Sequence, residues 1–127
     1  MPLNVLIVDD SKLVHAMIAQ TLEMADVEIQ EVLHAMNGKE GLDILRRQPI
    51  DLVFSDIHMP VMDGIEMIEA AFQDEKLRSI PIVVISSEGS HKRIDELKNF
   101  GVKHYIRKPF TPETINEVVK QEIGEGT

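Results

Sequence analysis

This chain has no cysteine and no tryptophan, and it has a single tyrosine. The absence of cysteine excludes disulfides, thiolate nucleophiles and metal sites with cysteine ligands. No apolar run is long enough to span a membrane, and the N-terminal MPLNVLIVDD lacks the basic region that opens a secretory signal. We therefore expect a cytoplasmic protein that does not bind membranes.

Basic residues are also scarce. Thirteen Lys and Arg stand against twenty-two Asp and Glu, which gives a net charge of −9. A surface of this charge repels phosphate backbones, so direct binding of nucleic acid is not expected, and most of the acidity serves solubility. With 127 residues, 43% of them hydrophobic, the chain is long enough to build one core. We expect residues 1–127 to form a single domain.

Short apolar runs alternate with segments of helical spacing along the whole chain. The runs cover residues 5–8, 29–35, 52–54, 82–85 and 104–106. This alternation predicts an α/β fold of (βα)5 type, a doubly wound five-stranded parallel sheet with helices on both faces.

The five runs differ in polarity, which predicts their order in the sheet. NVLIVDD, DLVFSD and PIVVISS are continuously apolar, as central strands are, whereas IQEVLHA and KHYIRK interleave polar residues, as edge strands do. The flavodoxin-like order 2-1-3-4-5 satisfies this pattern. The carboxyl ends of parallel strands meet at one edge of the sheet, and open α/β sheets bind their ligands there.

Polar residues follow four of the five runs and should meet at that edge. They are Asp9, Asp10, Asp56, Ser86, Ser87 and Lys108. Two carboxylates about 5 Å apart repel by roughly 3 kcal/mol at an effective dielectric near 20. A hard divalent cation relieves this repulsion, and Mg²⁺ suits a site with few protein ligands and room for water and a phosphoryl oxygen. We therefore predict a Mg²⁺ site at Asp9, Asp10 and Asp56.

Each of these residues also has a structural explanation when it is taken alone. Asp10 or Ser11 would serve as the cap of the following helix, and Lys108 would serve as a solvated lysine at a strand end. Their convergence on one edge favours the functional interpretation. His15, His34, His91 and His104 show no ligand spacing, so a transition-metal site is not expected, and most of the seven methionines are expected in the core.

Four motifs together resemble the receiver domain of bacterial response regulators, in its single-domain, chemotaxis-regulator form. They are VLIVDD, LVFSDIHMPVMDG, PIVVISSEG and YIRKPF, in this order, and the resemblance covers essentially the whole chain. It implies a two-component signalling protein that is phosphorylated by a sensor histidine kinase or phosphotransfer protein and then acts on a downstream protein effector. Such a protein is a phosphoacceptor with slow self-catalysed phosphorylation and dephosphorylation, not an enzyme.

At the matching positions the resemblance implies a phosphoacceptor and a metal site. Asp56 would accept the phosphoryl group, and Asp9 and Asp10 would bind Mg²⁺ together with Asp56 and the backbone carbonyl of His58. The residue types suit this chemistry. Phosphoryl transfer needs an in-line nucleophile and positive charge around the transferring oxygens, and a carboxylate nucleophile forms an acyl phosphate.

The resemblance also implies a switch. Lys108 would contact the phosphoryl group, and the Lys108-Pro109 peptide bond would be cis. Ser86 would hydrogen-bond to the phosphoryl group, a role that threonine also fills in the family, and Tyr105 would change rotamer with it. The alternative for Tyr105 is an ordinary aromatic residue of an edge strand.

Two further positions are expected to control how long the acyl phosphate lasts. His58 and Glu88 lie two positions beyond Asp56 and Ser86, where they would flank the path of the attacking water. Their structural alternative is that of solvated loop residues.

The end of the chain bears on the output. Thr111 and Pro112 predict the start of a last helix, and the chain stops at GEGT soon after it, so no effector domain is expected. The signal would then pass to a protein effector through the surface of the predicted fourth helix, fifth strand and fifth helix.

Two other functions stay open at this point. A phosphatase of the haloacid-dehalogenase type also uses an aspartate at a strand end with Mg²⁺, but it has a second aspartate two residues later, where this chain has His58. A degenerate receiver would act only as a protein-binding module. The complete set of Asp9, Asp10, Asp56 and Lys108 argues against that alternative.

Overall fold

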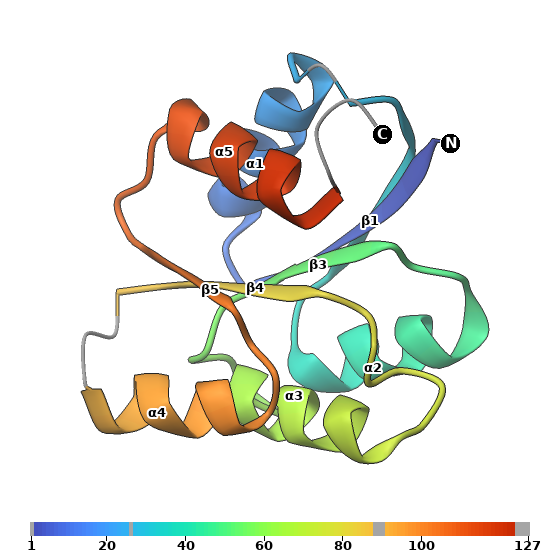
Figure 1. Cartoon of the computed structure of the whole chain (residues 1–127), viewed down its shortest axis with the longest axis vertical. Helices are drawn as coiled ribbons and strands as arrows, with labels where there is room; N and C mark the ends of the chain where they lie inside the picture. The colour runs from blue at the N-terminus through green and yellow to red at the C-terminus, as the bar shows by residue number, and fades with distance from the viewer. Residues whose placement is uncertain (1, 26, 88–90, 124–127) are drawn as a thin grey trace.

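The computed structural model describes residues 2–25, 27–87 and 91–123, and in this part of the chain strands and helices alternate (Figure 1). The strands are β1 Leu3–Val8, β2 Ile29–Ala35, β3 Leu52–Ser55, β4 Ile82–Ser86 and β5 His104–Arg107. The helices are α1 Lys12–Glu23, α2 Gly38–Arg47, α3 Gly64–Gln73, α4 His91–Asn99 and α5 Pro112–Ile123.

The sheet is parallel throughout, with the order β2-β1-β3-β4-β5, which confirms the predicted topology. Its register brings the carboxyl ends of the strands level. Val8 lies opposite Ala35 in β2 and opposite Ser55 in β3, and Ser55 lies opposite Val84 in β4. The residues that follow β1, β3 and β4 therefore emerge at one edge.

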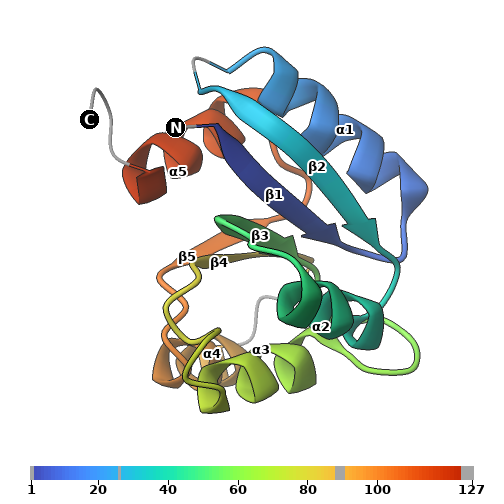
Figure 2. The same ribbon diagram turned by 90° about the vertical axis from the view of Figure 1, so that its right-hand side faces the viewer.

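Helices cover both faces of the sheet, with α1 and α5 on one face and α2, α3 and α4 on the other (Figures 1 and 2). Successive strand residues point to opposite faces. Ile7 and Phe54 pack on the side of α1 and α5, whereas Leu6 and Val53 pack on the other side. Burial of each such side chain contributes about 1.5–3 kcal/mol. Because both faces need apolar residues, the central strands are uninterrupted apolar runs.

The edge strands are more exposed, as predicted from their polar residues. β2 buries only Ala35 among its 7 residues, and β5 buries only Ile106 among its 4. Their outer side chains therefore remain available for contacts on the surface.

Two side chains differ from the helical pattern. Met17 of α1 and Phe72 of α3 stand at positions where the helical spacing of apolar residues predicts burial, but they are 40% and 39% exposed. Met17 and Phe110 line a cavity of about 210 Å³ between α1 and the start of α5, and the ring of Phe72 lies 5.8 Å from that of Phe100. Both residues sit at the margin of an apolar face, where a side chain touches the core and the solvent at once.

Helix caps fix the short connections at the carboxyl edge. Ser11, not Asp10, caps α1, because its hydroxyl accepts a hydrogen bond from the Val14 amide at 3.3 Å. Asp63 forms a capping box with Glu66 at the start of α3. Asp10 is thus left available for another role. No helix among the described residues has the length and apolar character needed to cross a bilayer.

Candidate functional site

Three carboxylates gather at the carboxyl edge of the sheet. Asp9 follows β1 and is 2% exposed, Asp56 follows β3 and is 8% exposed, and Asp10 is exposed. One oxygen from each lies within 4.8 Å of the others. The predicted acidic cluster is therefore present, with two of its members buried.

Asp56 is held in place by its neighbours. Its amide donates to the carbonyl oxygen of Val8 at 2.9 Å, and its carbonyl oxygen accepts from the Ser55 hydroxyl at 2.9 Å. The Ile57 amide donates to Oδ1 at 2.8 Å. Gly64 packs so closely that a Cβ at that position would overlap with the Asp56 carbonyl oxygen. The backbone and one carboxylate oxygen are thus fixed, and Oδ2 is directed towards Lys108.

Lys108 lies between the two buried carboxylates. Its Nζ is 3.2 Å from Oδ2 of Asp9 and 3.4 Å from Oδ2 of Asp56. Its amide donates to the carbonyl oxygen of Ser86 at 2.9 Å, and the Lys108-Pro109 bond is cis, as expected from the resemblance. The loop after β5 therefore returns its ammonium group to the acidic cluster.

The electrostatics of the site follow from burial and from these contacts. Burial raises the pKa of Asp9, and the nearby Asp56 adds to the rise, while the Ser11 amide and Lys108 oppose it. Burial alone would lower the pKa of Lys108, but attraction to Asp56 and Asp9 outweighs it, so the net shift is upward. The ammonium of Lys108 is therefore a stable positive charge.

This donor set fits a hard divalent cation. One ammonium faces three carboxylates, so negative charge remains in excess, and every carboxylate of the cluster offers an oxygen ligand. Mg²⁺ prefers oxygen ligands and keeps several waters, which suits a cluster with one exposed member. The role of the His58 carbonyl as a further ligand stays a prediction, and the His58 side chain is exposed.

The predicted switch residues lie on the neighbouring strands β4 and β5. Ser86 is the last residue of β4 and is fully buried. Tyr105 lies on β5 opposite Val84, is half-buried, and packs against the core on the side of α2, α3 and α4. It also borders a small cavity with Ile94 and Leu97 of α4. Glu88 lies outside the described residues.

A pair of histidines at the site was missed by sequence reasoning. His15 Nε2 lies 2.7 Å from the carbonyl oxygen of Asp9, and His15 Nδ1 lies 2.7 Å from Nδ1 of His34. Burial and, second, the neighbouring His15 lower the pKa of His34, which favours the neutral form of the His34 ring. The two residues are 19 positions apart and lack ligand spacing, so nothing in the sequence indicates their contact.

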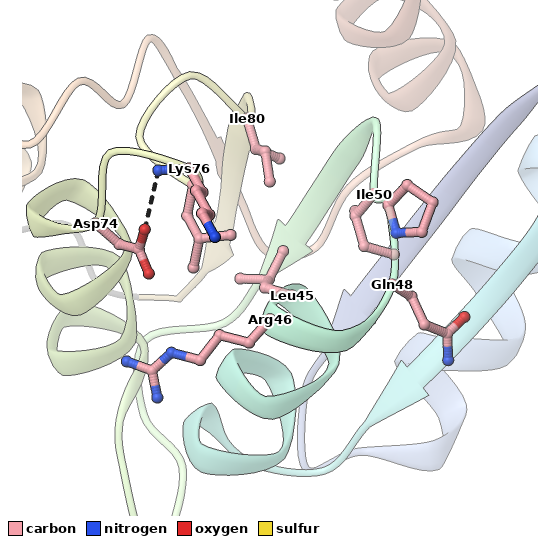
Figure 3. Close-up of a pocket in the computed structure, with 9 residues that line it drawn as sticks. Leu45, Arg46, Gln48, Ile50, Asp74, Lys76 and Ile80 are labelled. Carbon is pink, nitrogen blue, oxygen red and sulfur yellow. Dashed lines mark hydrogen bonds between the residues drawn. The ribbon is translucent and has the colours of Figure 1, made fainter.

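A separate cavity of about 480 Å³ lies at the other edge of the sheet, where β3 and β4 begin (Figure 3). Leu45, Ile50, Leu77 and Ile80 form its apolar part, and the Lys76 amide donates to Asp74 at 2.9 Å on its rim. None of the acidic cluster borders this cavity. The acidic cluster is therefore separate from this cavity.

Comparisons with known proteins agree with this geometry. The family model for the response regulator receiver domain matches residues 5–120. A chemotaxis protein CheY homolog of Campylobacter jejuni is 30% identical over 126 residues, which cover 98% of this chain and 95% of the relative. Chemotaxis protein CheY1 of Helicobacter pylori is 31% identical over 123 residues, which cover 96% and 98%.

Solved structures show the same fold. The chemotaxis response regulator CheY4 of Vibrio cholerae superposes with a TM-score of 0.84 at 32% identity, covering 95% of this chain and 98% of that one. A CheY-like receiver domain protein of Methanospirillum hungatei gives a TM-score of 0.85 at 26% identity, covering 98% and 96%. The chain belongs to the response regulator receiver domain family and is a phosphorylation-activated response regulator of two-component signalling.

Proposed function

We propose that Asp56 is the phosphoacceptor and that Asp9, Asp10, Asp56 and the His58 carbonyl hold Mg²⁺ beside it. The observation that carries this proposal is the placement of the Lys108 ammonium 3.2 Å from Asp9 and 3.4 Å from Asp56. Positive charge around a buried carboxylate is what phosphoryl transfer needs, because the transition state spreads negative charge over the phosphoryl oxygens.

The transfer step uses one defined oxygen of Asp56. Oδ1 accepts a hydrogen bond from the Ile57 amide, so Oδ2, which faces Lys108, is the attacking atom. A new bond forms between Oδ2 and phosphorus while the bond between phosphorus and the donor's imidazole nitrogen breaks, and the electron pair leaves with the imidazole. Lys108 stabilises the oxygens that carry the developing charge. When bound, Mg²⁺ supplies further positive charge to the same oxygens.

The donor is a sensor histidine kinase or a phosphotransfer protein, since receiver domains take their phosphoryl groups from phosphohistidine. Family membership makes this chain a signalling protein, and we propose that its own reactions, phosphorylation from small donors and dephosphorylation, are slow. His58 and Glu88 are the proposed controls of the dephosphorylation rate. The exposed position of His58 suits contact with the attacking water.

The output face is formed by α4, β5 and α5. After phosphorylation the Ser86 hydroxyl turns to the phosphoryl oxygens, and Tyr105 turns inward towards the space next to β4. Burial of Ser86 at the end of β4 and the half-buried position of Tyr105 opposite Val84 support this sequence of movements. The changed face then binds a protein effector. Because the Campylobacter and Helicobacter relatives are named chemotaxis proteins, we propose a chemotaxis-type effector.

The remaining predictions fit this proposal. Residues 1–127 form one receiver domain, in keeping with a family match over residues 5–120. The haloacid-dehalogenase alternative is not favoured, because position 58 is histidine where that chemistry uses a second aspartate. The degenerate-receiver alternative is not favoured either, because the carboxylates and the lysine are all present and close together.

The test is chemical labelling with a small phosphodonor. The protein is incubated with acetyl phosphate and Mg²⁺, reduced with borohydride and analysed by mass spectrometry. We expect the label at Asp56, none in Asp56→Asn, and normal labelling in Asp43→Asn, which alters an exposed carboxylate of α2. Equal labelling of Asp56→Asn and the wild type would show that the phosphoacceptor is another residue.

A further inference from the structure

The histidine pair has a single consistent arrangement of protons when both rings are neutral. A carbonyl oxygen only accepts hydrogen bonds, so Nε2 of His15 must carry the proton that is donated to Asp9. Nδ1 of the same ring is then an acceptor. The proton between the two Nδ1 atoms, which are 2.7 Å apart, therefore belongs to His34. The Asp9 carbonyl oxygen thus selects the tautomer of His15, His34 donates to the free Nδ1 of that tautomer, and His15 is only 6% exposed.

The carbonyl group that His15 binds belongs to the peptide plane between Asp9 and Asp10. The other end of Asp9 is also fixed, because its amide donates to the carbonyl oxygen of Ala35 at 3.1 Å. That amide belongs to the preceding peptide, so the hydrogen bond from His15 is the one that orients the Asp9-Asp10 plane, and this orientation sets the direction in which Asp10 leaves the backbone. Within the described residues the Asp10 carboxylate has no hydrogen-bond partner that would orient it by itself.

We propose that His15, held by His34, is a positioning residue that orients the Asp9-Asp10 peptide and with it the acidic pair of the Mg²⁺ site. The proposal rests on the proposed function, because it assigns a role towards the same cation. Residues that hydrogen-bond to metal ligands without binding the metal themselves commonly have a strong effect on the affinity for the metal. His15 and His34 also join α1 and the edge strand β2 to the acidic cluster.

A purely structural role for His15 makes a different prediction. If the pair only fills space between α1 and β2, its loss lowers the stability of the fold and leaves the affinity for Mg²⁺ unchanged. If it positions the peptide, affinity falls by more than stability explains. The two roles separate when Mg²⁺ binding and unfolding are measured on the same variants.

The variants are chosen to separate volume from hydrogen bonding. His15→Phe keeps a ring but cannot donate, whereas His15→Gln can still donate an amide proton to the Asp9 carbonyl oxygen. Thr21→Ala is the matched control, because Thr21 is another buried polar residue of α1, 6% exposed, whose hydroxyl donates to the Met17 carbonyl oxygen at 2.8 Å away from the site. His34→Phe tests the second ring.

Mg²⁺ titrations followed by amide chemical shifts give the dissociation constants, and urea unfolding in EDTA gives the stabilities. We expect His15→Phe to weaken Mg²⁺ binding about tenfold and His34→Phe to weaken it less. His15→Gln should recover most of the affinity, and Thr21→Ala should lose stability alone. Nitrogen-15 spectra of the imidazole rings should show that Nε2 of His15 is protonated and Nδ1 is not.

The outcomes distinguish this inference from the proposed function. A wild-type protein that fails to bind Mg²⁺ would overturn both. Binding by the wild type with unchanged affinity in His15→Phe would overturn the positioning role alone. If His15→Phe does not fold, the decision passes to His34→Phe and to the ring spectrum of the wild type, where the opposite tautomer of His15 would refute the arrangement.

Discussion

The amide of Lys108 donates a hydrogen bond of 2.9 Å to the carbonyl oxygen of Ser86. This bond joins the loop that carries the ammonium to the end of β4, where the proposed switch hydroxyl lies. The end of β4 is thus tied through the backbone to the residue whose ammonium contacts Asp9 and Asp56.

The variant Ser86→Ala should uncouple phosphorylation from the output face. The hydroxyl that is removed is not the proposed nucleophile, so beryllofluoride should still bind at Asp56. A hydrogen bond to a charged group contributes about 1.5–3 kcal/mol. Without it, the activated conformation loses most of its free-energy advantage over the inactive one. Amide chemical shifts of α4, β5 and α5 should then respond less than in the wild type. A response of the same size in both proteins would remove Ser86 from the switch.

The variant Lys108→Met should lower stability in EDTA by about 1–3 kcal/mol, because two buried carboxylates lose their counter-charge and the lysine side chain is only 24% exposed. Mg²⁺ should restore more stability to this variant than it gives to the wild type. Lys103→Met, at an exposed lysine before β5, is the control.

The same pair of proteins has a defined pH dependence. The raised pKa of Lys108 means that its contribution is lost only as the pH rises above the ordinary value of 10.5 and through the raised one. Unfolding curves of the wild type and Lys108→Met should therefore converge in alkali. Equal stabilities at neutral pH in EDTA would contradict the role of the ammonium.

The variant Asp9→Asn should stabilise the fold at pH 7 in EDTA by about 0.5–2 kcal/mol, because it removes a buried negative charge that lies near Asp56. The pKa of Asp9 is raised above 3.8, so its contribution is favourable below that value and is lost as the pH rises through the raised pKa. The gain from Asn should therefore shrink on acidification. Urea unfolding at several pH values measures it, with Asp43→Asn as the control. A less stable Asp9→Asn at pH 7 would refute the cost of this charge.

The variant Gly64→Ala should displace the phosphoacceptor. The added methyl group would meet the Asp56 carbonyl oxygen, and such overpacking costs about 1–3 kcal/mol. Gly101→Ala is the matched control, because a φ of +84 makes alanine strained there while the nearest atoms lie 3.7 Å away on Phe72. Both variants should unfold more easily, but only Gly64→Ala should slow labelling by acetyl phosphate. Equal labelling rates would show that the close packing at Gly64 serves the fold alone.

The fold was predictable because its signals are local. Strands that are buried on both faces must be apolar runs, and even the mixed run 29–35 of an edge strand coincides with β2, Ile29–Ala35. The ends of the strands are marked less clearly in the sequence. The apolar run 52–54 predicts a strand that stops at Phe54, whereas β3 continues to Ser55, whose hydroxyl donates to the Asp56 carbonyl oxygen. The acidic cluster was predictable for the same reason, since parallel strands carry their end residues to one edge.

Contacts that depend on packing between elements were not predictable. His15 and His34 are in contact because α1 packs against β2. His104 of β5 and Glu122 of α5 are likewise 2.8 Å apart because their elements pack together. Neither pair has a sequence spacing that indicates it. Met17 shows the converse case, because its helical position predicts burial while the width of the α1 contact leaves it 40% exposed.

The half-buried position of Tyr105 has an optical consequence. Tyr105 is the one tyrosine of the chain, and there is no tryptophan to mask or quench its emission. Intrinsic fluorescence excited in the tyrosine band therefore comes from a single ring on β5, next to α4, at the face that is proposed to bind the effector. Stopped-flow fluorescence of the unlabelled protein can thus test in real time, without an attached dye, whether this ring moves on phosphorylation.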